Sequence, residues 1–261
     1  MTSSGGNLVR VHTARSVTTL TLDSPANRNA LSTALIDELL AALAGAVGDP
    51  AVRVVVLSHT GPVFCSGVDL AETAAARAAG TLPAARMGEL LQAVWECPKP
   101  VLARVGGAAR AGGLGLVAAA DIAVCPTDAT FAFSEVRVGV VPALISATVL
   151  PRLTSRAAAE LFLTGEVFDG TRAAHVGLVT AAVPPTDLDG SVERYVASLL
   201  RAAPGATAGA KALLRRTPPA GTAANLAELT GISLAYFDSA EGREGVAAFR
   251  EKRDPSWVPG G

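Results

Sequence analysis

The segment RAGGLGLVAAAD, residues 110–121, places a cluster of glycines between a short apolar run and an alanine-rich run. The preceding PVLARV, residues 100–105, has the pattern of a buried strand, and the residues after Gly113 have the composition of a buried helix. The first N–H groups of a helix lack intrahelical partners, and the helix dipole favours negative charge beside them. Gly112 and Gly113 therefore indicate an oxyanion site or a close packing of strand on helix, and the segment fits both. It does not fit the glycine fingerprints of nucleotide-binding loops.

Strand and helix patterns alternate on both sides of this segment. VTTLTLD, residues 17–23, alternates apolar and polar side chains, and VRVVVLS, residues 52–58, is apolar on both faces as a buried parallel strand would be. Between them, Ser32 can cap a helix whose leucines recur at helical spacing. The alternation predicts an α/β fold with right-handed crossover connections.

After Leu150 the chain is expected to be mainly helical. Ser155 is expected to cap a helix that ends at Gly165, and Asp169 is expected to cap the next helix.

Composition favours a globular protein that acts on small molecules. The 261 residues are 50% hydrophobic, enough for one large core, and 22 Lys and Arg balance 23 Asp and Glu, which leaves no basic excess for nucleic acid. Cys65, Cys97 and Cys125 lie far apart, which predicts no disulfide framework and no metal site and fits a reducing compartment. No uncharged apolar run reaches the ~20 residues that span a bilayer, so we expect a cytoplasmic protein without membrane contact.

A second loop of small residues changes the interpretation of the glycine segment. CSGVDL, residues 65–70, follows the strand predicted at residues 52–58, and its amides can face the same point as those of Gly112 and Gly113. Two such loops can supply two N–H donors to one oxygen that becomes negative during a reaction, each donor contributing about 3 kcal/mol.

Six segments, in this order, carry a resemblance to a known family: NRNALS, PVFCSGVDL, PKPVLARVGGAARAGGLGLVAAADIAV, FAFSEVRVGVVP, LTGEVFDGTRAAHVGLV and AFREKRDPSW. The chain resembles the crotonase superfamily, also called the enoyl-CoA hydratase/isomerase family, and is most similar to bacterial hydratases of the methylglutaconyl-CoA hydratase type. The resemblance implies an α/β spiral of ββα units over residues 1–200. It also implies a C-terminal helical region, residues 201–261, that covers the site and supports a homotrimer or homohexamer. The substrate would be an acyl-CoA thioester, with no further cofactor.

The resemblance also implies roles for individual residues. The amides of Val68 and Gly112 would hold the thioester oxygen as it becomes an enolate, and Glu135 would be the general acid and base. Coenzyme A would contact a larger set, part of it from a neighbouring subunit: Arg28, Ala30, Leu31, Ser66, Asp69, Leu70, Phe249 and Lys252.

Gly115 stands where hydratases of the family usually carry a first glutamate. Three functions stay open: a hydratase that works with Glu135 alone, which we favour, a Δ3,Δ2-enoyl-CoA isomerase, and a non-catalytic acyl-CoA-binding relative. We expect Gly115 to leave room for substrate and a glutamate there to fold.

Other polar residues are expected to be structural. Arg110 is expected to be a solvated loop residue rather than a ligand for a substrate carboxylate. His59 and His175 are expected in a loop and on a helix surface, and Asp121 is expected to pair locally after its helix.

Overall fold

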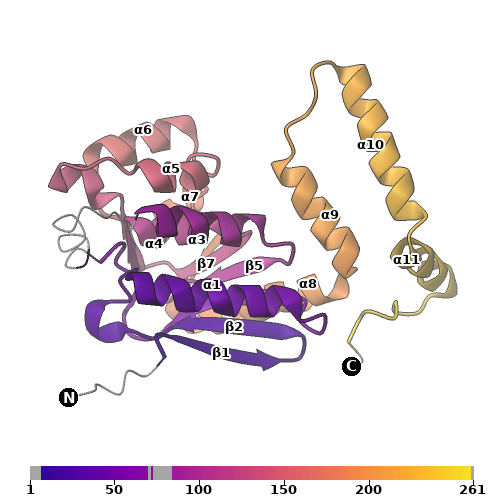
Figure 1. The fold of residues 1–261 in the computed structure, drawn as a ribbon, viewed down its shortest axis with the longest axis horizontal. Coiled ribbons are helices and arrows are strands. Elements are labelled where there is room, and N and C mark those ends of the chain that lie inside the picture. The colour runs from indigo at the N-terminus through magenta and orange to yellow at the C-terminus, as the bar shows by residue number, and fades with distance from the viewer. Residues whose placement is uncertain (1–6, 70–71, 73–83, 260–261) are drawn as a thin grey trace.

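The fold is built on a six-stranded sheet in a computed structural model that describes residues 7–69, 72 and 84–259 (Figure 1). Its strand order is β1 (Val9–Ala14), β2 (Val17–Leu22), β3 (Val54–His59), β5 (Val101–Arg104), β7 (Ile122–Pro126) and β10 (Ala181–Val183). The first two strands form an antiparallel hairpin and the other neighbours pair in parallel. The strands predicted near residues 17–23, 52–58 and 100–105 are confirmed.

A smaller sheet lies at the carboxyl side of these strands, in the order β4 (Val63–Cys65), β6 (Ala108–Arg110), β8 (Thr130–Ala132) and β9 (Phe168–Asp169). The chain passes from β3 to β4, from β5 to β6 and from β7 to β8, so each turn adds one strand to each sheet. A helix follows each of the first two turns, α3 (Ala84–Glu96) and α4 (Gly112–Ala119). This repeated ββα unit confirms the predicted spiral.

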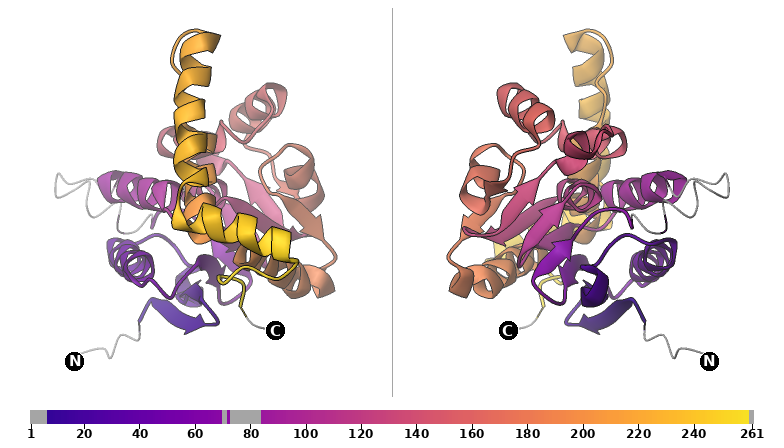
Figure 2. Two further views of the ribbon diagram at one scale, coloured as in Figure 1. Left: turned by 90° about the vertical axis from the view of Figure 1, so that its right-hand side faces the viewer. Right: turned by 90° about the vertical axis from the view of Figure 1, so that its left-hand side faces the viewer.

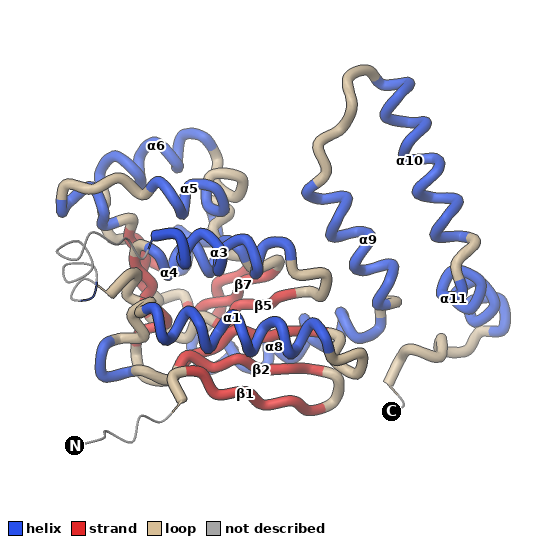
Figure 3. The backbone as a smooth tube through the Cα atoms, in the orientation of Figure 1, coloured by secondary structure: helices blue, strands red, loops and turns tan. Residues whose placement is uncertain are grey.

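Helices cover both faces of the larger sheet (Figure 3). Helix α1 (Thr33–Gly48) buries Leu35, Leu39 and Leu43 on one face, and α8 (Leu188–Arg201) packs Leu188 and Val192 on the other. Strand β3 therefore has buried side chains on both faces, which explains its unbroken apolar sequence. The Ser32 hydroxyl accepts a hydrogen bond from Leu35 N at 3.2 Å, as the predicted cap requires.

The helices after β8 are short. Following the 3₁₀ turn η2 (Ser134–Val138), they are α5 (Ala143–Val149), α6 (Ser155–Thr164) and α7 (Gly170–His175); the other 3₁₀ turns are η1 (Pro25–Asn27) and η3 (Pro185–Asp187). Gly165 ends α6 at φ +61°, and the Asp169 carboxylate caps α7 by accepting from Arg172 N at 2.7 Å, both as predicted. The predicted cap at Ser155 is wrong, because Ser155 is already the first residue of α6 and Thr154 precedes it.

Residues 204–259 form an arm that projects away from the sheets, with helices α9 (Pro204–Arg215), α10 (Thr222–Phe237) and α11 (Ala240–Glu251) (Figure 1). Figure 2 shows α10 reaching past the rest of the molecule in both side views. No helix in the described ranges is long and apolar enough to cross a membrane.

Asp121 fastens this arm to the core. Its carboxylate lies 2.6 Å from Lys211 Nζ and 2.7 Å from an Arg215 guanidinium nitrogen, both on α9. Arg215 and Arg152 stack on Trp95, with guanidinium carbons 5.0 and 4.8 Å from the ring centroid. The expectation of local pairing for Asp121 is therefore wrong, because both cations come from a distant helix.

Candidate active site

One cavity of about 310 Å³ brings together three residues that the sequence singled out. They are Val68, Gly112 and Glu135. The rest of the lining is apolar and consists of Met87, Ala111, Val140, Val141, Pro142, Ala143, Leu144 and Ile145. The cavity therefore combines two loop amides with one carboxylate in a largely hydrocarbon surrounding.

The two glycine-containing loops lie side by side. Leu31 N donates to Gly67 O at 2.8 Å, and Val68 forms a parallel β-bridge with Leu31. Gly67 has φ +94°, and a Cβ on it would lie 3.1 Å from Gly112 N and 2.9 Å from Ala111 Cβ. Glycine is required at position 67 both for this backbone conformation and for the close approach of the second loop.

The amides of Val68 and Gly112 are available to a ligand. Within the described part of the chain, neither N–H donates a hydrogen bond to another residue. Ala111 enters α4 at φ +46° and ψ −120°, an unfavourable conformation for an L-residue, and this turn sets the direction of the following amide. Arg152 donates to the carbonyls of Ala118 and Ala120 at 3.0 Å at the other end of α4. The positive end of the helix dipole thus faces the cavity.

The two glycines have different surroundings. A Cβ on Gly113 would lie 2.6 Å from the carbonyl oxygen of Cys65, so this glycine permits the close packing of helix on strand that the sequence suggested. A Cβ on Gly112 would lie 2.9 Å from Met87 Cε and 3.4 Å from Gly67 Cα. A side chain at position 112 would therefore crowd Met87 and also Leu31, whose Cδ1 would lie 3.3 Å from the new Cβ, while the contact with Gly67 would be of ordinary van der Waals length.

Glu135 lies in η2 and has the properties of a general acid and base. Its Oε2 atom is buried and has no hydrogen-bond partner among the described residues. Burial raises the pKa of Glu135 above its usual value, since desolvation penalises the ionised carboxyl. The neighbouring Arg137 does not neutralise it, because Arg137 Nε donates to Thr164 O at 3.0 Å instead. A carboxyl with a raised pKa is better suited than an ordinary glutamate both to accept and to donate a proton.

Gly115 does not open space for a substrate. A Cβ there would lie 2.7 Å from Cγ2 of Ile145 and 3.1 Å from Cδ2 of Leu91. Thr148 Oγ1 also donates to the Gly115 carbonyl at 3.1 Å, which draws α5 close against α4. The expectation that Gly115 leaves room for an acyl group is wrong, because Ile145 fills that volume.

Most of the residues predicted to contact coenzyme A border the same loops. Ser66 N donates to Arg28 O at 3.1 Å, and Ala30 and Leu31 are buried where residues 28–31 meet residues 66–68. The Asp69 carboxylate accepts from Glu72 N at 3.0 Å. Leu70 lies outside the described residues.

Asn29, within the segment expected to offer its backbone to coenzyme A, also holds this loop in place through its side chain. Its side-chain amide donates to Thr60 O at 3.0 Å and Val63 O at 2.8 Å, and its Oδ1 accepts from Ser24 N. Asn29 is fully buried with φ +53°, a conformation that asparagine tolerates better than most residues. Asparagine is common at positive φ, so the Asn in the triplet Arg28-Asn29-Ala30 was the feature of the sequence that could have indicated this turn.

The two predicted tail residues are not at the cavity of their own chain. Phe249 is 86% exposed on α11, and Lys252 ends that helix. The described residues that line the cavity all fall between positions 68 and 145. Contact of the arm with a site, and its covering function, stay predictions for a neighbouring subunit.

Three further polar residues are accounted for by structural contacts. Arg110 is half-buried and donates to the Thr130 hydroxyl at 2.9 Å, so it neither faces solvent freely nor lines the cavity. The loop expected at His59 is wrong, because His59 is buried at the end of β3 and its Nε2 accepts from Gly106 N at 2.9 Å. His175 lies exposed on α7 as predicted.

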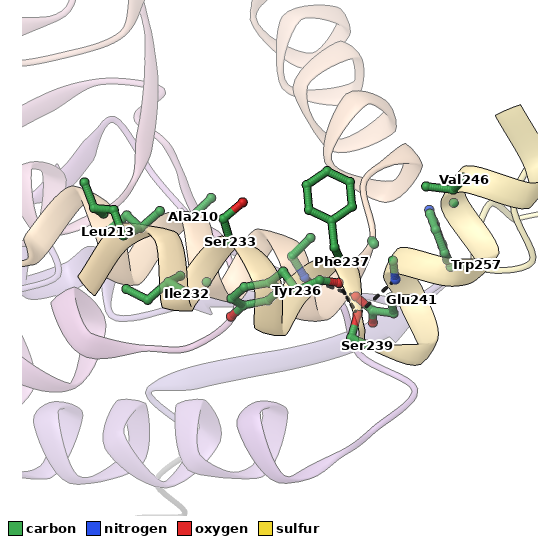
Figure 4. A pocket seen from close by; sticks show the side chains of 16 residues that line it. Ala210, Leu213, Ile232, Ser233, Tyr236, Phe237, Ser239, Glu241, Val246 and Trp257 are labelled. Carbon is green, nitrogen blue, oxygen red and sulfur yellow. Dashed lines mark hydrogen bonds between the residues drawn. The ribbon is translucent and has the colours of Figure 1, made fainter. Parts of the chain in front are cut away.

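A larger cavity of about 550 Å³ lies within the arm, between α9, α10 and α11 (Figure 4). Tyr236, Phe237 and Trp257 line it, and its Glu241 carboxylate is engaged by the amides of Gly205 and Ala206 at 3.0 and 3.1 Å. Among the described residues that line this cavity the one carboxylate is Glu241, and it already caps α9, so no carboxylate there is left for acid–base chemistry. The cavity lined by Val68, Gly112 and Glu135 is therefore the candidate active site.

Comparison with known proteins agrees with this geometry. The sequence profile of the Enoyl-CoA hydratase/isomerase family matches residues 12–259. A probable enoyl-CoA hydratase of Rhodobacter capsulatus is 36% identical over 252 residues, which cover 96% of this chain and 97% of that protein. A peroxisomal Delta(3,5)-Delta(2,4)-dienoyl-CoA isomerase of Arabidopsis thaliana is 32% identical, covering 96% of each.

The solved structure of Pseudomonas aeruginosa AtuE superposes with a TM-score of 0.91 at 35% identity, covering 96% of this chain and 99% of that one. The family profile spans nearly the whole chain, and both the sheet topology and the relatives agree with it. The chain therefore belongs to the enoyl-CoA hydratase/isomerase family, the crotonase superfamily.

Proposed function

We propose that the protein is an enoyl-CoA hydratase that adds water across the 2,3 double bond of an acyl-CoA thioester, or catalyses the reverse dehydration. The observation that carries the proposal is that Glu135, whose Oε2 is buried without a hydrogen-bond partner, lines the same cavity as Val68 and Gly112, whose amides donate to no other described residue. The hydratase names of two relatives support this type of reaction.

In this reaction Glu135 handles one proton twice. Its carboxylate accepts a proton from water as the water oxygen bonds to C3, and the electrons of the double bond move to the thioester oxygen. The Val68 and Gly112 amides hold the resulting enolate. Glu135 then returns the proton to C2, so that H and OH are both added and the carboxylate is regenerated. A raised pKa suits a group that must accept and donate at similar pH.

The second candidate is a Δ3,Δ2-enoyl-CoA isomerase, and a specific observation favours it. Apart from Glu135, the side chains that line the cavity in the described residues carry no polar group that could orient a water. Ile145 also excludes a carboxylate from position 115. An isomerase needs neither a group that orients water nor a second carboxylate, because a single base moves the proton between C2 and C4.

The proposal extends to partners. Acyl-CoA is the substrate, and coenzyme A enters only as part of it. A homotrimer or homohexamer would give the apolar cavity of the arm a protein neighbour and could bring Phe249 and Lys252 to another subunit's substrate. The cytoplasmic location stays a prediction.

A panel of 2-enoyl- and 3-enoyl-CoA thioesters tests the reaction, with products identified by mass. Formation of 3-hydroxyacyl-CoA, 18 mass units heavier than the 2-enoyl substrate by addition of water, supports the hydratase. Migration at constant mass supports the isomerase. Tight binding without either product would refute catalysis and leave the acyl-CoA-binding relative.

A further inference from the structure

We infer that the acyl chain continues from the candidate active site into a groove between α3 and α5, that the preferred acyl group is a medium-length uncharged hydrocarbon, and that Leu144 limits its length. This inference rests on the proposed acyl-CoA chemistry and names the substrate class for that site.

The groove is a second cavity of about 280 Å³ that adjoins the first. Leu144 lines both cavities. Leu91 lines the groove and Ile145 lines the active-site cavity, and both side chains lie close to the position that a Cβ on Gly115 would occupy, at 3.1 and 2.7 Å. Three apolar side chains, Leu91, Leu144 and Ile145, therefore lie where the two spaces adjoin.

Helix α3 runs along both spaces. Met87 lines the active-site cavity, and Leu91 and Trp95 line the groove, at intervals of four residues on one helix face. Eight residues of helix cover about 12 Å. An octanoyl chain is of comparable length, whereas a four-carbon acyl group ends well short of Trp95.

Of the three side chains between the two cavities, Leu144 is the one with room to move. Leu91 and Ile145 are each 3% exposed and fixed in the core, but Leu144 is 42% exposed. Its side chain can therefore change rotamer to admit a longer chain, or block the groove if it is enlarged.

Charge in the groove disfavours a carboxylated acyl group. The only ionisable side chain lining it in the described residues is Glu96, which accepts from Gln92 Nε2 at 3.1 Å. The nearby cations are already engaged: Arg215 bonds Asp121, and Arg152 bonds the carbonyls at the end of α4. A terminal carboxylate would enter this space without a partner and beside a like charge.

Binding can be measured without turnover, because Trp95 lies in the groove and Trp257 is the other tryptophan of the chain. In the Trp257→Phe protein, octanoyl-CoA should shift the Trp95 emission and butyryl-CoA should not. The Trp95→Phe protein is the control and should show no octanoyl-specific shift. Equal shifts with both thioesters, or bound octanoyl-CoA with no shift, would overturn the acyl path even if the enzyme is active.

Turnover measurements then test whether Leu144 limits the length of the acyl chain. The ratio of kcat/KM for 2-octenoyl-CoA to that for crotonyl-CoA should fall at least about tenfold in Leu144→Trp, since several methylenes lose their apolar site. Leu163→Trp, at an 80% exposed position on α6 that lines neither cavity, should leave the ratio unchanged. An unchanged ratio in Leu144→Trp would contradict the role of Leu144.

Hexenoyl-CoA should be used at least about tenfold better than 2,3-dehydroadipyl-CoA, which differs from it by a terminal carboxylate. Equal or better use of the carboxylated substrate would refute the uncharged class. If neither is turned over, the proposed reaction fails, and the binding of hexanoyl-CoA against adipyl-CoA decides the substrate class separately.

Discussion

The Ile145 side chain occupies the volume that any side chain at Gly115 would need, with Ile145 Cγ2 2.7 Å from the position of a Cβ on Gly115. The packing of α5 on α4 therefore leaves no room for a carboxylate side chain at position 115, and Glu135 is the one carboxylate among the described residues that line the cavity. The contact explains why a glycine stands at this point of a buried helix.

Gly115→Ala should lower the free energy of unfolding by about 1–3 kcal/mol, because overpacking forces Ile145 or the helices to shift. Chemical denaturation measures this. Gly45→Ala, in α1 with no atom within 4 Å of the new Cβ, is the matched control and should stabilise by about 0.5–1 kcal/mol. In an Ile145→Ala background the cost of Gly115→Ala should shrink by about 1 kcal/mol. Equal costs in both backgrounds would mean that Ile145 is not the obstacle.

Gly115→Glu should be less stable than Gly115→Ala and should not gain hydration activity.

Glu135→Gln should stabilise the protein at neutral pH. A glutamate whose folded pKa is raised contributes its stability fully only below its unfolded pKa, about 4.3, and loses it as pH rises through the folded pKa. The gain in Tm from Glu135→Gln should therefore be absent near pH 4 and increase toward pH 7 to 8. Glu166→Gln, at an exposed position, is the control and should show no such trend. A gain that is largest at low pH would mean that the carboxylate is not destabilised by burial.

Gly112→Ala should reduce turnover more than stability. The new Cβ meets the flexible end of Met87 at 2.9 Å, which can move, and Leu31 Cδ1 at 3.3 Å. Leu31 N donates to Gly67 O, so a displaced Leu31 shifts the loop that carries the Val68 amide. We expect kcat/KM to fall at least about tenfold, since misplaced oxyanion donors lose much of their contribution. Met87→Ala in the same chain should recover Tm without fully recovering kcat/KM. Full recovery of both would assign the effect to Met87 alone.

Asp121→Asn should loosen the arm. It removes the negative partner of Lys211, which is 6% exposed, and of Arg215, and breaking a buried ion pair typically costs about 3–5 kcal/mol. Hydrogen exchange should accelerate over residues 204–215. Asp254→Asn breaks an exposed pair with Arg201, where both side chains are about two-thirds exposed, and should cost about 1 kcal/mol or less. Unchanged exchange in Asp121→Asn would show that other contacts hold α9.

The parts of the fold that follow from local pattern could be predicted from the sequence. The periodicity of residues 17–23, the buried run at 52–58 and the caps at Ser32 and Asp169 are properties of neighbouring residues, and the structure confirms them. The two amide loops were also recognisable, because glycine marks close backbone approach in each.

The errors concern contacts between distant residues. Arg215 reaches Asp121 across 94 positions, and Ile145 fills the space beside Gly115 from another helix. Neither partner has a local signature. The strained backbone at Ala111 was also not predictable, because alanine gives no sign of a positive φ and the surrounding loops impose it.

The central claim is that Glu135 transfers a proton at C2 of a thioester whose oxygen is held by the amides of Val68 and Gly112. Hydrogen exchange of a saturated acyl-CoA in D₂O tests this directly, because it requires the enolate but neither hydration nor migration. Wild-type protein should introduce deuterium at C2 of octanoyl-CoA, and Glu135→Gln should slow this by about two orders of magnitude or more while octanoyl-CoA still binds. Exchange at the same rate in both proteins, or bound octanoyl-CoA that the wild-type protein never exchanges, would contradict the claim.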